Sequence, residues 1–386
     1  MARAPMAKRH KVLLFIPNLQ QGGAERQILE LMVRLPERFE PVLCLYHDVI
    51  HYRQYLPPSQ PRHVLGVKRM GIKGLRRLIS VLREEKPAIL HSYRDMANFW
   101  ARLAAIAAPV PVVLTSVRNR RIELLHAISE PFLSRISDRV LTNSEGVKRE
   151  LIKRAHVNEN RIQVLHNFVD LTQFRPPTDD ERRAARARWG LADDEIALLL
   201  PGRVGRQKNH IGLTLALRHL RRRGLLPPNL RLVLAGRINE RLVAAVLSRL
   251  WSFFDLAAQI RQLGTVSSAD MPTLYHAADV LVLPSLYEGL PNAVIEGHAS
   301  GLPAVVSRAA NADGLVLDGE SGYEVGTFDV GGLAAAIGRI VALAPEERRR
   351  MGAVGRDHLA TRFHPDRVLG ETVELYDHLL ALKGLA

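Results

Sequence analysis

Two glutamates in one short stretch could do the chemistry of a binding site. They are Glu288 and Glu296, separated by seven residues in PSLYEGLPNAVIEGHASGLPAVVS (284–307). The pattern predicts a strand over 280–283, a turn, and a helix from residue 292, so Glu288 lies on the loop and Glu296 about one turn into the helix. A carboxylate at this place can accept hydrogen bonds from the vicinal hydroxyls of a ribose ring. Glu296 therefore suits the sugar of a nucleotide.

The start of the same helix could hold an anion. Its first residues and the turn before them are Gly289, Leu290, Pro291 and Asn292. The free N–H groups of a helix start carry about half a positive charge, which favours a phosphate. For an isolated glutamate in such a place, an exposed loop or helix acid remains the ordinary interpretation.

Cations follow an earlier predicted strand. In PGRVGRQKNH (201–210), Arg203 and Lys208 lie on a glycine-rich turn at the carboxyl end of the strand. Arginine as a fork of donors and lysine as a point charge suit a diphosphate, although either residue alone is usually a surface charge. Near the start, NLQQGGAERQ joins a strand to a helix through Gly22 and Gly23, which allow a backbone to approach a ligand. This turn is not the GxGxxG fingerprint of dinucleotide-binding proteins.

Several motifs are missing from the sequence, which narrows the chemistry. It contains no Asp-x-Asp, His-Glu-x-x-His, Walker A, Gly-x-Ser-x-Gly or Cys-x-x-Cys motif. We therefore expect no resident metal ion, no cofactor and no serine-hydrolase site. The negative charge of a leaving diphosphate would be neutralised by Arg203, Lys208 and helix N-termini.

The composition is that of a soluble globular protein with two domains. The chain has 386 residues, of which 47% are hydrophobic and 24% charged. Its single cysteine, Cys44, lies in an apolar run, which excludes an intrachain disulfide and favours a reducing, cytoplasmic location. The apolar run 12–16 is too short for a signal peptide, and no stretch is long enough to span a bilayer.

Positive charge is concentrated in the first half of the chain. Residues 1–175 contain 29 Lys and Arg against 15 Asp and Glu, whereas residues 176–386 contain 25 against 24. Part of the excess lies in a predicted basic amphipathic helix, with Lys68, Arg69, Lys73, Arg76, Arg77, Arg83 and Lys86 around apolar residues at helical spacing. A plain solvated face and contact with an anionic membrane at its inner surface are the two interpretations of this helix. Motifs of nucleic-acid-binding proteins are missing, so nucleic acid is not an expected partner.

Short β-rich runs alternate with helical patterns along the chain. The predicted strands are 11–16, 41–46, 88–91, 112–117, 139–142 and 161–165 in the first half, and 196–200, 230–235, 280–283, 303–306 and the short edge candidate 322–325 in the second. This alternation predicts an α/β protein with two doubly wound, Rossmann-like domains facing each other across a cleft. The pattern breaks near Pro176-Pro177. We place an N-terminal domain at 1–173 and a C-terminal domain at 174–365, with a closing helix over 366–386 that packs back on the first domain.

These motifs together match a known family. GRVGRQKN, YEGLPNAVIEGHASGLPAVVS and DGESGYEV, with GGAERQ near the start and HNFVDLTQF before the linker, resemble the retaining glycosyltransferases of family four, also called glycosyl transferases group 1. The resemblance runs over nearly the whole chain and implies the two-domain GT-B fold. It also implies a nucleotide-sugar donor, most commonly a UDP-sugar, held mainly by the second domain. A carbohydrate or lipid-linked acceptor would be held mainly by the first.

The resemblance assigns roles to individual residues. Glu296 would bind the donor ribose, Arg203 and Lys208 the diphosphate, and Glu288 the transferred sugar. Gly23 would approach the phosphate from the first domain. The loop from Gly264 to Val266 would receive the base through its backbone. In this family the leaving diphosphate itself is thought to accept the proton of the acceptor, so no separate base is required.

Two positions depart from the family pattern. Arg118 stands where many members have a histidine, and SRAANADGLV (307–316) replaces a segment with a Gly-Gly and a further glutamate. Arg118 is either a contact for an anionic acceptor or a surface arginine, and His91 and Asp95 are weaker acceptor-side candidates. The expected activity is hexosyl transfer in bacterial polysaccharide or glycolipid synthesis. The alternatives are a sugar-nucleotide epimerase or hydrolase and a non-catalytic, basic membrane-associated scaffold.

Overall fold

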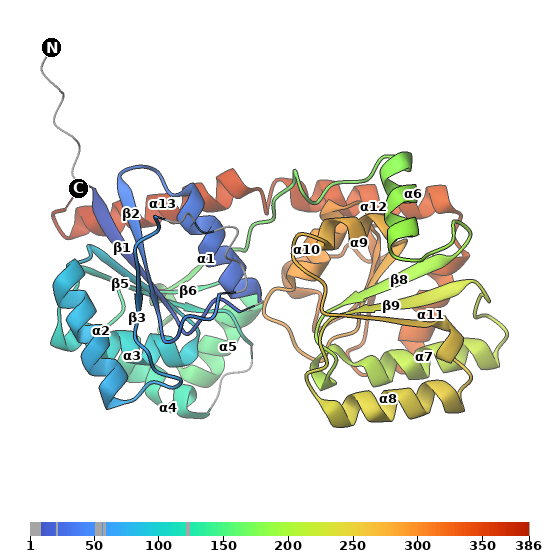
Figure 1. Cartoon of the computed structure of the whole chain (residues 1–386), viewed down its shortest axis with the longest axis horizontal. Coiled ribbons are helices and arrows are strands. Elements are labelled where there is room, and N and C mark those ends of the chain that lie inside the picture. Colours follow the sequence, from blue (N-terminus) through green and yellow to red (C-terminus); the bar gives the residue numbers. More distant parts are fainter. Residues whose placement is uncertain (1–8, 21, 51–55, 57–58, 121–123, 386) are drawn as a thin grey trace, which may run out of the picture. The chain divides into compact units, whose positions relative to one another are not determined.

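A computed structural model describes residues 9–20, 22–50, 56, 59–120 and 124–385. The chain divides into two compact units, one of Met1–Phe168 with Asp366–Ala386 and one of Val169–Pro365 (Figure 1). The boundary expected from the sequence, between residues 173 and 174, lies five residues after the one in the structure. Each unit is an α/β layer structure of its own, which confirms the predicted fold class.

The first unit is built on a parallel sheet. In the described part of this unit the sheet has seven strands in the order β3-β2-β1-β4-β5-β6-β7. The strands are β1 (His10–Ile16), β2 (Phe39–Leu45), β3 (Arg62–Val64), β4 (Ile89–Tyr93), β5 (Val112–Val117), β6 (Arg139–Thr142) and β7 (Ile162–Val164). The chain runs outward from β1 to β3, returns to β4 beside β1, and then runs the other way. The point where the order reverses therefore lies between β1 and β4.

Helices cover both faces of this sheet (Figure 1). They are α1 (Gly23–Arg34), α2 (Ile72–Glu85), α3 (Asp95–Ala107), α4 (Leu124–Leu133), α5 (Glu145–Ala155) and α13 (Pro365–Leu382), with a 3₁₀ turn, η2 (Glu159–Arg161). α1 and α13 pack on one face around Leu14, Ile28 and Tyr376. α2 and α3 pack on the other face around Leu13, Leu78 and Ala101. Strands buried on both faces explain why the sequence shows continuous apolar runs there rather than alternation.

The second unit repeats the plan. Its described residues form a six-stranded parallel sheet in the order β10-β9-β8-β11-β12-β13. The strands are β8 (Ile196–Pro201), β9 (Leu230–Ala235), β10 (Ile260–Gly264), β11 (Val280–Leu283), β12 (Ala304–Ser307) and β13 (Gly322–Val325). The order reverses between β8 and β11, which pair through Val280 with Leu198 and Leu281 with Leu199. Loops after these two strands meet at the usual ligand position of such sheets.

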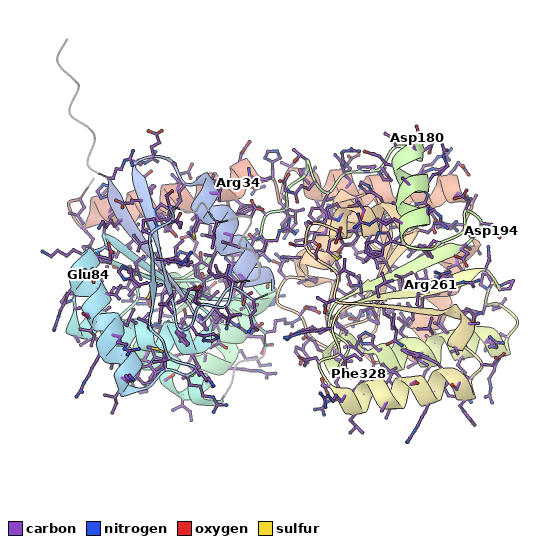
Figure 2. All side chains as sticks on the ribbon, viewed as in Figure 1. Arg34, Glu84, Asp180, Asp194, Arg261 and Phe328 are labelled. Carbon is purple, nitrogen blue, oxygen red and sulfur yellow. The ribbon has the colours of Figure 1, made fainter. Side chains whose placement is uncertain are left out.

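The helices of the second unit enclose two apolar layers. They are α6 (Asp179–Arg188), α7 (His210–Arg222), α8 (Arg241–Phe253), α9 (Met271–Ala277), α10 (Asn292–Ala299), α11 (Val330–Ala342) and α12 (Pro345–Ala360), with 3₁₀ turns η3 (Arg206–Lys208), η4 (Ala257–Gln259) and η5 (Ala312–Gly314). One layer packs α9 and α10 on the sheet, and the other packs α7, α8 and α11. Charged side chains such as Glu84 on α2 and Asp180 on α6 lie on the outside of their units (Figure 2).

Two strands are not among those that the sequence predicts. β3 reads RHV and β10 reads IRQLG, and each lies at an edge of its sheet. An edge strand is covered less completely than a central one, so it needs no continuous apolar run and gives only a weak pattern. The predicted basic helix is confirmed as α2, which buries Leu78, Val81 and Leu82 and leaves Ile72 exposed.

Candidate functional site

The loop between β8 and α7 is shaped by close backbone contacts. Gly202 has φ +141°, and a Cβ atom there would lie 2.5 Å from Cε of Lys208. A Cβ atom on Gly236, just after β9, would lie 2.1 Å from the carbonyl oxygen of Gly202. Only glycine lets these two strand ends approach so closely. The loop after β8 is thereby held close to the end of β9.

A lysine and a glutamate, 80 residues apart in sequence, meet at this edge. Nζ of Lys208 lies 2.8 Å from Oε1 of Glu288, and the side chains are only 15% and 11% exposed. Lys208 ends η3 after β8, whereas Glu288 lies on the loop after β11. The structure therefore brings together two of the residues that the sequence assigns to one site. Both charges are near the surface but largely shielded from water, which strengthens their attraction.

Neighbouring contacts hold the two loops in register. The N–H of Leu286 donates to the carbonyl of Gln207 at 2.8 Å, and Nε2 of Gln207 donates to the carbonyl of Tyr287 at 3.1 Å. Asn209 adopts φ 54° and caps α7 by accepting the N–H of Gly212 at 3.1 Å. These contacts limit the freedom of the loop that carries Lys208.

His210 is a supporting residue that sequence reasoning did not identify. It is 3% exposed, and its Nδ1 lies 3.3 Å from the carbonyl oxygen of Gly205. Burial lowers the pKa of His210 to about 4, with a smaller contribution from the charge of Lys208. The ring is therefore neutral at pH 7, and Nδ1 carries the proton that it donates to Gly205. Its position directly after the predicted Lys208 and Asn209 is the signal that could have found it.

Arg203 lies on the same loop with its side chain exposed. Among the described residues, no carboxylate forms an ion pair with it. An unpaired guanidinium beside the Lys208–Glu288 pair leaves a cation available to a ligand. This arrangement suits an anion with more than one charged oxygen, since the fork of donors on arginine can bind two oxygens at once.

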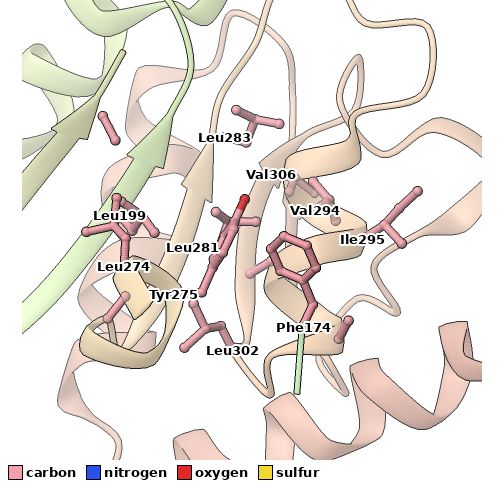
Figure 3. Packing of buried hydrophobic residues seen from close by; sticks show 14 of the residues in the cluster. Phe174, Leu199, Leu274, Tyr275, Leu281, Leu283, Val294, Ile295, Leu302 and Val306 are labelled. Atoms are coloured by element: carbon pink, nitrogen blue, oxygen red, sulfur yellow. The ribbon is translucent and has the colours of Figure 1, made fainter. Parts of the chain in front are cut away.

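Glu296 is the fifth of the eight residues of α10 and is held by a tyrosine. The hydroxyl of Tyr275, on α9, donates to Oε2 of Glu296 at 2.9 Å. Figure 3 shows the Tyr275 ring packed among the apolar residues of this layer, near Phe174, which it meets edge-on at 5.7 Å. The buried ring fixes the hydroxyl and so orients the carboxylate. Tyr275 is a second residue that sequence reasoning missed, because nothing near it in sequence marks its partner.

The other predicted residues of the second unit lie at the same edge of the sheet. Leu290 and Pro291 are buried, with Pro291 immediately before the first residue of α10, Asn292. Gly289 lies beside them. Gly264 ends β10 with φ 67°, and Val266, two residues later, is 6% exposed. Gly289, Leu290 and Pro291 follow the carboxyl end of β11, whereas Gly264 and Val266 lie at the end of β10, a strand that the sequence did not predict.

In the first unit, Gly22 and Gly23 begin α1 directly beyond β1. Gly22 is the N-cap in an extended conformation, and a Cβ atom there would lie 2.3 Å from Oε2 of Glu25. Glu25 is 5% exposed, and its Oε1 accepts a hydrogen bond from Nη1 of Arg94 at 3.2 Å. Arg94 follows β4 with φ 79°. This ion pair joins the first turn of α1 to the residue after β4 at the reversal point of the first sheet, and it was not predicted.

The acceptor-side candidates of the first unit differ in their surroundings. His91 is 2% exposed, with Nδ1 at 2.7 Å from the hydroxyl of Tyr376 and Nε2 at 2.8 Å from Oγ of Ser116. Burial holds the pKa of His91 well below its usual range, so the ring is neutral. Arg118, one residue beyond β5, is partly exposed and lies over the Tyr93 ring at 5.3 Å. Asp95 begins α3.

The structure also bears on metal ligands and membrane spans. Within the described residues, no group of three or more His, Cys, Asp and Glu side chains is arranged to hold a metal ion. Of the helices in that part of the chain, none is long and apolar enough to cross a membrane.

Family models match both halves of the chain. The model described as glycosyl transferases group 1 matches residues 181–358, and the model described as glycosyltransferase family 4 matches residues 21–173. The chain belongs to the group 1 glycosyltransferases. The resemblance inferred from the sequence motifs is thereby confirmed.

Individual group 1 relatives share about a quarter to a third of their aligned residues with this chain. A UDP-Gal:α-D-GlcNAc-diphosphoundecaprenol α-1,3-galactosyltransferase of Escherichia coli is 27% identical over 75% of this chain and 74% of its own length. A D-inositol 3-phosphate glycosyltransferase of Mycobacterium tuberculosis is 30% identical over 71% of this chain. The matched region spans only 58% of that mycobacterial protein.

Solved structures agree with the fold of this group 1 member. Anabaena HepE in complex with UDP and glucose has a TM-score of 0.85 at 17% identity, covering 96% of this chain and 100% of that one. The lipopolysaccharide glycosyltransferase WaaG has a TM-score of 0.74 at 14% identity, covering 95% of this chain and 99% of that one. At these identities the likeness establishes the two-domain fold alone.

Proposed function

We propose that this protein is a retaining glycosyltransferase that moves a hexose from a nucleoside-diphosphate sugar, with a UDP-sugar favoured, to a carbohydrate or lipid-linked acceptor. The reaction belongs to bacterial polysaccharide or glycolipid synthesis. The observation that carries the proposal is the 2.8 Å pair of Lys208 and Glu288 where β8 meets β11. Ligands of doubly wound sheets bind at this reversal point.

Different residues of the second unit would bind different parts of the donor. Glu296, oriented by Tyr275, would accept hydrogen bonds from the ribose hydroxyls. Arg203, Lys208 and the N-terminus of α10 would neutralise the diphosphate, and Glu288 would contact the transferred sugar. The donor-holding charges stand in fixed positions, so little reorganisation is needed as charge builds on the leaving group.

The bond changes follow from this arrangement. The bond between C1 of the sugar and the diphosphate oxygen breaks, and its electron pair stays with the diphosphate. The acceptor oxygen forms a bond to C1 on the same face, and its proton passes to the leaving diphosphate. Lys208 and Arg203 stabilise the charge that develops on the diphosphate without themselves giving up a proton. We infer that this step uses no resident metal ion.

The activities of relatives support the choice of donor and acceptor. The Escherichia coli relative is named for UDP-galactose as donor and a diphosphoundecaprenol-linked sugar as acceptor. The Anabaena structure contains UDP and glucose. Both agree with a UDP-sugar donor, and the first agrees with a lipid-linked acceptor.

A panel of donors tests the proposal. Thermal unfolding would be followed with UDP-, GDP- and ADP-sugars, since a ligand at a hundred times its dissociation constant stabilises the folded state by about 2.7 kcal/mol. We expect one nucleotide to stabilise the protein clearly more than the others. The anomeric configuration of the transferred sugar would then be read by NMR. Inversion at C1, or release of free sugar with no transfer to any acceptor, would contradict the proposal.

We further propose that α2 contacts an anionic membrane at the cytoplasmic face. Lys73, Arg76, Arg83 and Lys86 are exposed on or just after this helix, and Ile72 is 71% exposed. Basic side chains near an anionic surface contribute about 1 kcal/mol each, and an exposed isoleucine can insert at the boundary.

Vesicle flotation separates this proposal from a plain solvated face. Vesicles with phosphatidylglycerol should float the protein at low salt, and vesicles of phosphatidylcholine should not. The variant Lys73→Gln/Arg76→Gln should reduce the recovery. Equal recovery with both lipids would rule the proposal out.

A further inference from the structure

A small cavity lies in the first unit at the carboxyl edge of its sheet. Its volume is about 20 Å³, enough for a water molecule or for the oxygen of a larger guest. Polar side chains from strand ends line it, among them His91, Ser116, Arg118 and Thr142. Arg118 and His166, which also lines it, are partly exposed, so a ligand can reach it from solvent.

Two polar atoms around this cavity lack a partner. Nε of Arg118 and Oγ1 of Thr142 are buried, and neither forms a hydrogen bond within the part of the chain that the structure describes. Thr142 is 2% exposed, so water at the molecular surface does not satisfy its hydroxyl. An unpaired buried polar group costs about 1–3 kcal/mol. A guest that accepts hydrogen bonds from both atoms would remove that cost.

The Arg118 guanidinium at the cavity has polar and aromatic neighbours but no carboxylate partner among the described residues. Nη1 of Arg118 donates to Oδ1 of Asn167, a neutral amide, and among the described residues no carboxylate forms an ion pair with it. Arg102, by contrast, has a carboxylate of Glu130 at 2.6 Å. After burial, the phenol of Tyr93 influences the pKa of Arg118 most, and Glu25 comes next. The carboxylate of Glu25 is already paired with Arg94 at 3.2 Å.

The other ionisable groups at the cavity add no negative charge. Burial raises the pKa of Tyr93 to about 12 and lowers the pKa of His91, so both are neutral at pH 7. Burial also lowers the pKa of Arg118, because its charged form has lost water without gaining an anion. An anionic guest would supply what the protein does not.

We propose that this cavity binds an oxyanion, the phosphate or carboxylate group of a ligand, between the guanidinium of Arg118 and the hydroxyl of Thr142. Both residues can donate to the same anion, and guanidinium binds oxyanions with a geometry that ammonium does not match. The assignment of this oxyanion to the glycosyl acceptor rests on the proposed function. The binding site itself does not, because it is built from residues of the first unit alone.

Calorimetry with inorganic phosphate on the full chain tests the site. Titrations would use wild type, Arg118→Met, Thr142→Val and, as a matched control at the other candidate anion site, Arg203→Met, all at constant ionic strength. We expect phosphate affinity at one site to fall at least about tenfold in Arg118→Met, the loss of one charge-assisted hydrogen bond. Phosphate affinity should fall less in Thr142→Val, which keeps the shape of the side chain. In Arg203→Met, phosphate affinity at the Arg118 site should equal that of wild type.

Two results would overturn the proposal. One is equal phosphate affinity in wild type, Arg118→Met and Thr142→Val. The other is that Arg203→Met loses phosphate binding completely while Arg118→Met keeps the affinity of wild type. That result would place the anion in the second unit. Circular dichroism of each variant checks folding. If a variant fails to fold, anomalous diffraction from wild-type crystals soaked in selenate would locate the anion. Selenate density away from Arg118 would also overturn it.

A second comparison identifies the source of the oxyanion. Glycerol 3-phosphate would be titrated beside inorganic phosphate. If the group belongs to an acceptor, glycerol 3-phosphate should bind the tighter of the two, and Arg118→Met should weaken both. If the ligand is free phosphate, inorganic phosphate should bind more tightly than glycerol 3-phosphate. These titrations need no donor sugar, so their failure would leave glycosyl transfer standing, and a failed donor panel would leave the oxyanion site standing.

Discussion

The pair of Lys208 and Glu288 is the contact on which the donor site depends. Its two charges lie 2.8 Å apart with side chains only 15% and 11% exposed, so each is largely removed from water. In such surroundings the loss of one partner leaves the other charge poorly solvated. The lysine would serve two purposes, since it neutralises Glu288 in the free protein and would meet the donor diphosphate during the reaction.

Replacing Lys208 should therefore damage turnover more than folding. For Lys208→Met we expect kcat to fall about 100-fold, as when a single donor to a developing anion is removed. Stability should fall by about 1–3 kcal/mol, because Glu288 loses its partner. Steady-state kinetics and urea unfolding measure the two effects.

Arg206→Met is the matched control for this prediction. Arg206 lies in the same 3₁₀ turn, but its side chain is 81% exposed and pairs with Glu240 at the surface. Exposed pairs contribute little, so we expect its activity to stay within about twofold of wild type. Equal losses in the two variants would show that the turn as a whole, and not the lysine, matters.

Glu296 should determine donor affinity rather than turnover. In Glu296→Gln the charged acceptor becomes a neutral amide, and we expect KM for the donor to rise about tenfold or more with a smaller change in kcat. Tyr275→Phe keeps the ring in its apolar layer and removes only the hydroxyl that orients Glu296 at 2.9 Å. Its KM should rise less. An unchanged KM in Glu296→Gln would contradict the role of this residue in ribose binding.

At the scale of elements, both sheets place their candidate residues where the strand order reverses. In the second unit the loops after β8 and β11 carry Lys208 and Glu288. In the first unit Glu25 lies in the first turn of α1, the helix that follows β1, and Arg94 lies directly after β4. Each reversal point is thus bridged by an ion pair. Adjacent parallel strands end at the same edge, so residues far apart in sequence become neighbours there.

The end of β9 lies so close to the loop after β8 that Gly236 should not be replaceable by a residue with a side chain. In Gly236→Ala the new Cβ atom would lie 2.1 Å from the carbonyl oxygen of Gly202, so the backbone must shift. We expect a loss of about 1–3 kcal/mol in stability and a loss of activity, because the shifted loop carries Arg203 and Lys208.

Gly370→Ala provides the opposite case. Gly370 lies inside α13, and a Cβ atom there would meet no other atom within 4 Å. Replacing a helical glycine by alanine should raise stability by about 0.5–1 kcal/mol. Thermal unfolding of both variants tests the pair of predictions. Similar changes in stability in both variants would show that the backbone near Gly236 can shift without loss of stability.

At the scale of the whole molecule, buried neutral histidines link stability to pH. His91 lies in the first unit, and His210 and His298 lie in the second. Burial lowers the pKa of His210 and of His298 to about 4, and it holds the pKa of His91 well below its usual range. These folded-state pKa values lie below the value of about 6.5 for histidine in an unfolded chain. The unfolded chain therefore binds more protons between pH 6.5 and 4.

Stability should be complete above pH 6.5 and fall as the pH drops toward 4. Each of these histidines contributes a slope of up to about 1.4 kcal/mol per pH unit in that range. Urea unfolding at pH 7.5, 6 and 5 measures the total. In His298→Gln, where the amide can still donate to the carbonyl of Leu302, the slope should fall by the share of one histidine. An unchanged slope would contradict this account.

The sequence by itself predicted most of the elements and named the residues proposed for the donor site. β5, β6, β9 and β11 have the predicted bounds, because central parallel strands are buried on both faces and need continuous apolar runs. β13 also has the predicted bounds, although it lies at an edge of its sheet. Arg203, Lys208, Glu288 and Glu296 could be assigned to one site because strand ends, glycines and helix starts are local signals.

Only the tertiary structure decided which side chains meet. Lys208 with Glu288, Tyr275 with Glu296, Glu25 with Arg94, and His91 with Tyr376, 285 residues away, are contacts between distant parts of the chain. Such contacts depend on the order of strands in the sheets and on which helix covers which face. The edge strands β3 and β10 were missed because partly exposed strands need no continuous apolar pattern. That no carboxylate among the described residues pairs with Arg118 has the same origin, since this becomes visible only when every neighbour is in place.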